Sequence, residues 1–219
     1  MNILIVAATE FEVKPLLDYL KVDNALPGMN FSNNATGLKD VRVLITGVGM
    51  VNIAFMMGRY SNTLYDLVLN VGVCGAFNRD LQLGEVVHVT QDVLSEMGAE
   101  DGDRFMTYDE LNLPGDYIFN QQLATDFEAF HKLSQVKGVT VNTVHGNEKS
   151  IAVVQELFRP DVESMEGAAF YAACVRSGEN YTQIRAVSNY VEKRDKSKWQ
   201  MSLAIANLND FLIRFIENL

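Results

Sequence analysis

The chain has 219 residues, a net charge of −10, a hydrophobic fraction of 48% and a charged fraction of 21%. This composition supports a substantial core and excludes a disordered chain, and the length fits one large domain or two small ones. The negative charge argues against nonspecific nucleic-acid binding, which needs lysines and arginines to neutralise phosphates. We therefore expect a soluble protein that acts on small molecules.

The N-terminal segment and the cysteines indicate a cytoplasmic location. Residues 1–8 are apolar, but they are few, lack a basic flank and lead directly to Glu10 and Glu12, which favours a first strand over a signal peptide. No apolar run is long enough to span a bilayer, so no membrane partner is expected. Cys74 and Cys174 have small or apolar neighbours, which favours buried, reduced thiols over a disulfide.

The first half of the chain alternates predicted strands and helices. Residues 3–7 form a continuous apolar run that is typical of a strand buried on both faces. Residues 10–20 have apolar positions at helical spacing, with Pro15 in the early turns, where proline is tolerated. A second strand is predicted at residues 41–46, and the glycines at 47–49 lead into a helix.

The second half continues this alternation. Strands are predicted at residues 67–71, 86–90, 139–144 and 183–188, and an amphipathic helix at residues 199–218. Residues 95–117 are polar, acidic and aromatic, and are expected to form a long loop. The pattern predicts a single α/β domain over residues 1–219, with a central mixed but mostly parallel sheet flanked by helices.

Several polar or glycine residues follow the predicted strands. In α/β sheets, ligands bind beyond the carboxyl ends of the strands, so these positions are expected to converge on one site. They are Glu10, Glu12, Gly47, residues 72–75 and Asn189. The glycines at 47–49 and 72–75 either cradle a phosphate or make tight turns, and both interpretations stay open because neither matches a dinucleotide or Walker motif.

Glu166 is the least expected charge in the chain. It directly precedes a small-residue, apolar helix start, where a carboxylate needs a partner. Arg185 offers a structural ion pair; the functional alternative is that Glu166 accepts hydrogen bonds from a diol. The three histidines lack metal-ligand spacing, so no metal site is expected, although His145 follows a predicted strand and is a minor candidate for the site.

Five segments together resemble the nucleoside phosphorylase superfamily, and its 5′-methylthioadenosine/S-adenosylhomocysteine nucleosidase branch in particular. They are residues 8–13, 47–49, 70–75, 164–166 and 185–189. Within the superfamily, the chain most resembles the futalosine hydrolases, through residues 98–103, 141–144, 162–169 and 188–192. The resemblance implies the superfamily fold, a purine nucleoside substrate, a homodimer or higher oligomer, and no metal or organic cofactor.

The same resemblance implies roles for individual residues. Glu12 matches the carboxylate that activates the attacking water, and Arg185 matches an arginine near that nucleophile. Glu166 matches the residue that binds the ribose hydroxyls, and Met165 the one that packs on the sugar. The remaining expected substrate-binding residues are Val73, Cys74, Gly75, Gly146 and Asn147.

Asn189 is the main departure from this pattern. It occupies the position where the methylthioadenosine nucleosidases carry an aspartate that protonates the leaving base. An amide cannot act as a general acid, but it can donate one hydrogen bond to the O6 or N7 acceptors of a 6-oxopurine. The substitution therefore favours hypoxanthine over adenine as the leaving base.

The resemblance also predicts which reaction takes place. Residues 7–10 lack the arginine that binds phosphate in the phosphorylases, and Val73 stands where relatives often carry a hydroxyl. Hydrolysis of futalosine to hypoxanthine and dehypoxanthinyl futalosine, a step of menaquinone biosynthesis, is therefore expected. The aromatic carboxylate at the 5′ end of futalosine is expected to stack on Phe105, Tyr108 or Tyr117. The alternatives are another nucleosidase or phosphorylase, and a non-catalytic nucleoside-binding protein.

Overall fold

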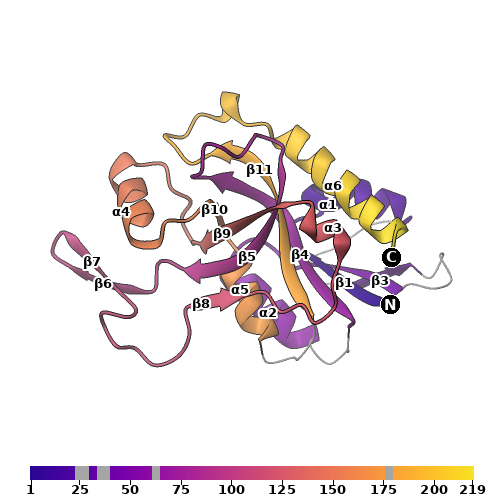
Figure 1. Ribbon diagram of the computed structural model, residues 1–219, viewed down its shortest axis with the longest axis horizontal. Coiled ribbons are helices and arrows are strands. Elements are labelled where there is room, and N and C mark those ends of the chain that lie inside the picture. Colours follow the sequence, from indigo (N-terminus) through magenta and orange to yellow (C-terminus); the bar gives the residue numbers. More distant parts are fainter. Residues whose placement is uncertain (23–29, 34–39, 61–64, 176–179) are drawn as a thin grey trace.

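The computed structural model describes residues 1–22, 30–33, 40–60, 65–175 and 180–219. They form a central sheet with helices on both of its faces (Figure 1). The predicted α/β class is confirmed, and the sheet is mixed. Five of the strand ladders described in this sheet are parallel and four are antiparallel.

The main sheet has nine strands in the order β10-β9-β5-β11-β4-β1-β3-β2, with β8 beside β5. Their bounds are β1 (Asn2–Ala7), β2 (Asn30–Asn33), β3 (Asp40–Ile45), β4 (Leu67–Ala76), β5 (Val86–Leu94), β8 (Ile118–Asn120), β9 (Ser134–Thr140), β10 (Val162–Ser164) and β11 (Tyr181–Tyr190).

The short strand β10 closes part of this sheet into a ring. It pairs with β9 on one side and also with β4, so β4, β11, β5, β9 and β10 form a closed circuit of five strands. The closing contact lies at the carboxyl end of β4, where Gly75 is the register partner of Glu163. Sequence patterns did not predict this closure, which brings residues far apart in the chain to one place.

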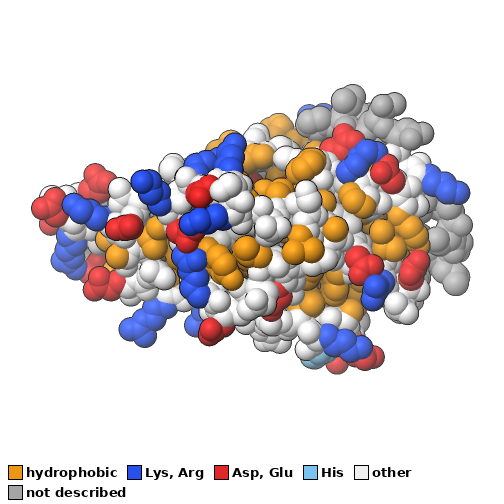
Figure 2. Space-filling view, turned by 90° about the horizontal axis from the view of Figure 1, so that it is seen from above, with side chains coloured by type: hydrophobic (Ala, Val, Ile, Leu, Met, Phe, Trp, Pro, Cys, Tyr) orange, Lys and Arg blue, Asp and Glu red, His pale blue; other side chains and the backbone are white. Residues whose placement is uncertain are grey.

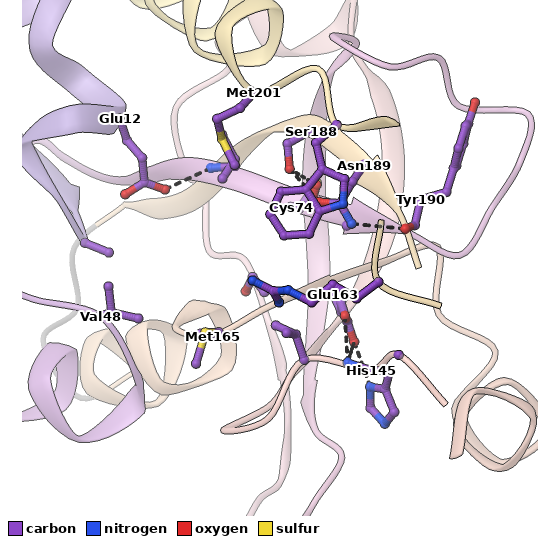
Figure 3. Close-up of a pocket in the computed structure, with 18 of the residues that line it drawn as sticks. Glu12, Val48, Cys74, His145, Glu163, Met165, Ser188, Asn189, Tyr190 and Met201 are labelled. Carbon is purple, nitrogen blue, oxygen red and sulfur yellow. Dashed lines mark hydrogen bonds and ion pairs between the residues drawn. The ribbon is translucent and has the colours of Figure 1, made fainter. Parts of the chain in front are cut away.

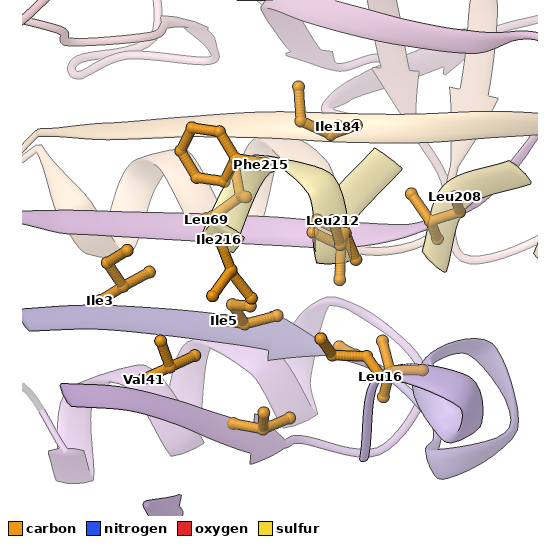
Figure 4. Packing of buried hydrophobic residues seen from close by; sticks show 14 of the residues in the cluster. Ile3, Ile5, Leu16, Val41, Leu69, Ile184, Leu208, Leu212, Phe215 and Ile216 are labelled. Carbon is orange, nitrogen blue, oxygen red and sulfur yellow. The ribbon is translucent and has the colours of Figure 1, made fainter. Parts of the chain in front are cut away.

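The helices divide between the two faces of the sheet. α2 (Met50–Tyr60) and α5 (Gly167–Cys174) pack on one face, while α1 (Glu10–Tyr19), α6 (Met201–Glu217) and the short α3 (Glu128–His131) cover the other (Figure 1). Strand β1 serves both, because Ile3 and Ile5 face the α1–α6 side (Figure 4) and Leu4 and Val6 face the α2–α5 side. Burial on both faces explains its continuous apolar run.

The structure corrects several predicted boundaries. Residues 72–75 continue β4 and do not form a turn, and Asn189 lies within β11 and not beyond it. Strand β9 ends at Thr140, earlier than predicted. The predicted loop at 95–117 contains a hairpin, β6 (Gly98–Asp101) and β7 (Arg104–Thr107). Helix α4 (Glu148–Phe158) was not predicted from the sequence.

The surface carries both signs of charge. In the view of Figure 2, acidic and basic side chains are interspersed, with apolar side chains between them. This face therefore lacks the broad basic stripe that marks nucleic-acid binding. None of the helices in the described ranges is both long and apolar enough to cross a membrane.

Helix α1 depends on a side chain from the far end of the chain. Pro15 lies inside α1, where its ring and missing N–H disturb the hydrogen bonding of the helix. The buried Asn209 of α6 accepts a hydrogen bond from the Leu16 N–H (3.0 Å) and donates one to the Glu12 carbonyl oxygen (2.8 Å). Asn209 thereby bridges two groups that would bond to each other in an uninterrupted helix.

Replacing Asn209 by alanine should destabilise the protein. The Leu16 N–H and the Glu12 carbonyl would lose a buried partner, which costs about 1–3 kcal/mol for each group that water cannot reach. The free energy of unfolding in urea measures this loss. Asn218→Ala, at the exposed end of the same helix, is the control and should change stability by less than about 0.5 kcal/mol. Equal effects of the two variants would contradict the bridging role.

Candidate active site

A cavity of about 330 Å³ lies at the carboxyl ends of β4, β10 and β11. Eight residues predicted from the sequence contribute to its lining: Glu12, Val73, Cys74, Gly75, Gly146, Met165, Glu166 and Asn189. Figure 3 shows Glu12, Val48 and Met165 on one side of the cavity, and Glu163 and His145 on the other. Of the positions that were expected to converge on one site, Glu12, residues 73–75 and Asn189 line this cavity, whereas Glu10, Gly47 and Gly72 do not.

Two predicted site residues are placed differently. Arg185 does not contribute to the lining; it is buried behind it, with 1% of its surface exposed. Asn147 caps α4, because its side-chain oxygen accepts a hydrogen bond from the Lys149 N–H (2.9 Å). Its neighbour Gly146 does line the cavity. Of these two predicted substrate-binding residues, one is therefore at the cavity and the other at the start of the adjacent helix.

Glu12 is fixed at the start of α1 by its own helix cap. Thr9 and Glu12 form a capping box, in which Glu12 Oε2 accepts hydrogen bonds from the Thr9 N–H (3.1 Å) and hydroxyl (2.9 Å). Its other oxygen, Oε1, accepts a hydrogen bond from the Val73 N–H (3.1 Å). Burial raises the pKa of Glu12, and the Val73 bond and the charge of Arg185 oppose this shift. A raised pKa suits a general base.

Glu166 and Arg185 form the predicted ion pair. Glu166 is at the N-cap of α5, and its Oε2 lies 3.7 Å from Arg185 Nη1. The other guanidinium nitrogen, Nη2, donates to the side-chain oxygens of Asn70 and Gln183. Glu166 Oε1 accepts a hydrogen bond from the Gly49 N–H (2.9 Å). The ion pair is thus part of a buried polar network at the edge of the cavity.

Carboxylates already occupy backbone N–H groups of both glycine segments. Gly49 donates to Glu166, and Val73 donates to Glu12. A phosphate would have to compete with a negatively charged group at each position, which argues against the phosphate-cradle interpretation. The turn interpretation holds for residues 47–49, where Gly47 and Gly49 have φ of 86° and 98°.

A β-bulge aims Asn189 at the cavity. The register of β11 against β4 shifts between Val187 and Asn189, so Ser188 is an extra residue in the strand. Asn189 Nδ2 donates to the Tyr190 carbonyl (3.0 Å), and Oδ1 accepts from the Ser188 hydroxyl (2.8 Å). Because a carbonyl can only accept, Tyr190 fixes the orientation of the amide. One Nδ2 hydrogen is left to donate elsewhere.

Sequence reasoning missed Glu163 entirely. This residue lines the cavity with 4% of its surface exposed, and it accepts hydrogen bonds from the His145 N–H (3.1 Å) and Nδ1 (2.7 Å). The available signal was a second glutamate, three positions before Glu166 and within the short buried strand β10. The minor candidate His145 also lines the cavity.

The aromatic residues of the 95–117 segment lie away from this cavity. Tyr108 and Tyr117 are buried and stack on each other, with ring centroids 4.9 Å apart. Phe105 lines a second cavity between the β6–β7 hairpin and α4. The aromatic side chains that line the main cavity are instead Phe11, Tyr190 and Trp199, and Arg194 lies over the Trp199 ring, 4.9 Å from its centroid.

Behind the cavity, Asp92 ties the polar network to the start of α5. Its Oδ1 accepts a hydrogen bond from the Thr140 hydroxyl (2.8 Å), and its Oδ2 accepts one from Gln183 Nε2 (3.2 Å). Thr140 in turn accepts from the Ala168 N–H in the first turn of α5 (2.7 Å). Burial raises the pKa of Asp92 to about 6. Among the described residues, no cluster of His, Cys, Asp or Glu side chains is placed to hold a metal ion.

Gly72→Ala should destabilise the protein because the added methyl group crowds two side chains of the site. A β-carbon there would lie 2.6 Å from Arg185 Nη1 and 2.7 Å from Glu12 Oε1. Overpacking a buried position costs about 1–3 kcal/mol, which urea unfolding would measure. Gly58→Ala is the matched control, because its β-carbon enters open space on α2, and it should gain up to about 1 kcal/mol. A neutral Gly72→Ala would show that the two side chains are free to move.

The cost of burying Asp92 should depend on pH. Because its pKa of about 6 lies above the ordinary value of 3.8, its contribution to stability is largest below the ordinary pKa and is lost as pH rises through about 6. The free energy of unfolding of the wild type minus that of Asp92→Asn should therefore be smaller at pH 7.5 than at pH 4.5. Urea unfolding at both pH values measures the difference, and a pH-independent difference would contradict the expectation.

Comparison with known proteins places this chain in a family. The family model of the phosphorylase superfamily matches residues 2–217. The futalosine hydrolase of Thermus thermophilus is 29% identical over 171 residues, which cover 75% of this chain and 76% of that protein. The 5′-methylthioadenosine/S-adenosylhomocysteine nucleosidase of a Marinomonas species is 26% identical over 205 residues, with 87% and 86% covered.

Solved structures agree with the fold. The structure of a futalosine hydrolase mutant of Helicobacter pylori has a TM-score of 0.83 at 17% identity and covers all of both chains. The Helicobacter pylori 5′-methylthioadenosine/S-adenosylhomocysteine nucleosidase with butyl-thio-DADMe-Immucillin-A has a TM-score of 0.82 at 17% identity, and covers 100% of this chain and 99% of its own. The chain belongs to the phosphorylase superfamily.

Proposed function

We propose that the protein is a purine nucleosidase that hydrolyses the N-glycosidic bond of futalosine and releases hypoxanthine and dehypoxanthinyl futalosine. The observation that carries the proposal is the placement of Glu12. Its buried carboxylate has a raised pKa, lines the cavity and interacts with the charges of Arg185 and Glu166.

In the proposed reaction, Glu12 takes a proton from the water that attacks the anomeric carbon. General-base assistance of this kind contributes on the order of 10²–10⁴ in rate. The glycosidic bond breaks with its electrons passing to the base, which takes up a proton from a water molecule, and positive charge develops on the ribose. Glu12 and Glu166 stabilise that charge, and Glu166 also accepts hydrogen bonds from the ribose hydroxyls while Met165 packs on the sugar.

Water is favoured over phosphate as the nucleophile. The Gly49 and Val73 N–H groups are already bonded to carboxylates, and the neighbouring loop at residues 7–10 has no arginine. Two carboxylates close to the nucleophile repel a dianion and attract a developing cation. The charge at this site therefore supports hydrolysis and not phosphorolysis.

Two observations support futalosine as the substrate. Futalosine hydrolases are among the relatives, and Asn189, an amide without an acidic proton, suits a 6-oxopurine better than adenine. Methylthioadenosine/S-adenosylhomocysteine hydrolysis is the second candidate, because nucleosidases with that name match up to 99% of the chain at 26% identity. A non-catalytic nucleoside-binding protein is the third, and would leave a bound nucleoside intact.

A panel of futalosine, inosine and methylthioadenosine, each with and without phosphate, separates the candidates by the base released. We expect hypoxanthine from futalosine, with no requirement for phosphate. Release of adenine from methylthioadenosine as the main activity would favour the second candidate. Full recovery of every nucleoside would favour the binding protein.

Glu12→Gln tests the mechanism in the same assay. It should lower hypoxanthine release at least 10²-fold, because an amide cannot take the proton, while thermal unfolding shows a folded protein. In the wild type, activity should fall as pH drops through the raised pKa of Glu12, above the ordinary value of 4.5. Near-normal turnover by the variant would remove Glu12 from the mechanism.

A further inference from the structure

Two side chains of opposite hydrogen-bonding character flank Gly75 in the cavity. Gly75 is the register partner of Glu163 on β10 and of Asn189 on β11. A β-carbon on Gly75 would lie 3.1 Å from Val191 Cγ2, 3.2 Å from Asn189 Nδ2 and 3.5 Å from Glu163 Cγ. Asn189 and Glu163 both line the cavity, so an amide donor and a carboxylate acceptor are available to a ligand near Gly75.

Hydrogen bonds hold each of these two side chains in one orientation. The Tyr190 carbonyl fixes the Asn189 amide so that Nδ2 keeps one hydrogen to donate. Glu163 accepts hydrogen bonds from two groups of His145, its N–H and Nδ1, and a carboxylate has lone pairs for at least one further donor. The space beside Gly75 therefore presents a donor next to an acceptor.

From this pair we infer that Glu163 is the residue that selects a 6-oxopurine base. The inference rests on the proposed nucleosidase function and assigns a base-recognition role that Asn189 alone cannot fill. Hypoxanthine carries the O6 acceptor and the N1–H donor on adjacent ring atoms, which match the Asn189 amide and the Glu163 carboxylate. Adenine presents an acceptor at N1, which faces a carboxylate unfavourably.

His145 supports this role by keeping Glu163 in place. Its Nδ1 lies 2.7 Å from Glu163 Oε2, and its ring packs near Phe77, with centroids 6.1 Å apart. Phe77 thereby restrains the His145 ring, and His145 in turn restrains the Glu163 carboxylate. Pre-organised acceptors of this kind lose little conformational entropy when they bind a ligand.

Binding of free bases tests the inference without depending on turnover. Trp199 is the single tryptophan of the chain and lines the cavity, so its fluorescence should report titrations with hypoxanthine, 1-methylhypoxanthine and adenine. The wild type should bind hypoxanthine at least 10-fold more tightly than the other two bases. Glu163→Gln should weaken hypoxanthine binding about 10- to 100-fold, the range expected for a charged hydrogen bond, and should bind 1-methylhypoxanthine nearly as the wild type does.

Glu110→Gln is the matched control. Glu110 also accepts a hydrogen bond from a backbone N–H, that of Thr107, and also pairs with a basic side chain, but it lies on the β6–β7 side, away from the cavity. This variant should bind all three bases as the wild type does. Thermal unfolding of both variants checks that the fold is intact.

The possible results separate the inference from the proposed function. If Glu163→Gln still prefers hypoxanthine over 1-methylhypoxanthine as strongly as the wild type, or if the wild type has no such preference, the inference is overturned. If the bases bind as expected but no nucleoside is cleaved, the proposed hydrolysis fails while base selection by Glu163 stands.

Discussion

One buried arginine holds the polar centre of this protein together. Among the residues that the structure describes, Arg185 is the one lysine or arginine that is buried, whereas Glu12, Asp92, Glu163 and Glu166 are buried carboxylates. A cluster of this composition would be costly without a central cation. Arg185 pairs with Glu166 and reaches Asp92 through Gln183, so the network extends from the cavity edge into the sheet.

The sheet is arranged around this arginine. Arg185 is the register partner of Gly72 on the parallel strand β4, and the missing side chain at Gly72 is the space in which Arg185 and Glu12 approach each other. The same strand supplies the Val73 N–H to Glu12 and, at Gly75, the gap between Asn189 and Glu163. The glycines of β4 thus act through close approach and not through backbone conformation.

Local patterns predicted those parts of the protein that local physics determines. The apolar run of β1, the amphipathic α6 and the buried charge at Glu166 were all visible, because periodicity and the cost of burial are properties of short segments. Glu163 was overlooked, since its place in the cavity follows from the β10–β4 closure between residues nearly ninety positions apart. The continuation of β4 through residues 72–75 was missed because glycine is more common in turns than in strands.

The Asn209 bridge has a consequence for the order in which the site forms. Glu12 is near the N-terminus, yet the helix that carries it is completed by a side chain 197 residues later. Contacts between such distant positions close a very long loop and tend to form late in folding. The placement of the carboxylate that we assign to water activation therefore depends on residues from both ends of the chain. A truncation that removes α6 would leave the Leu16 N–H and the Glu12 carbonyl without this bridge.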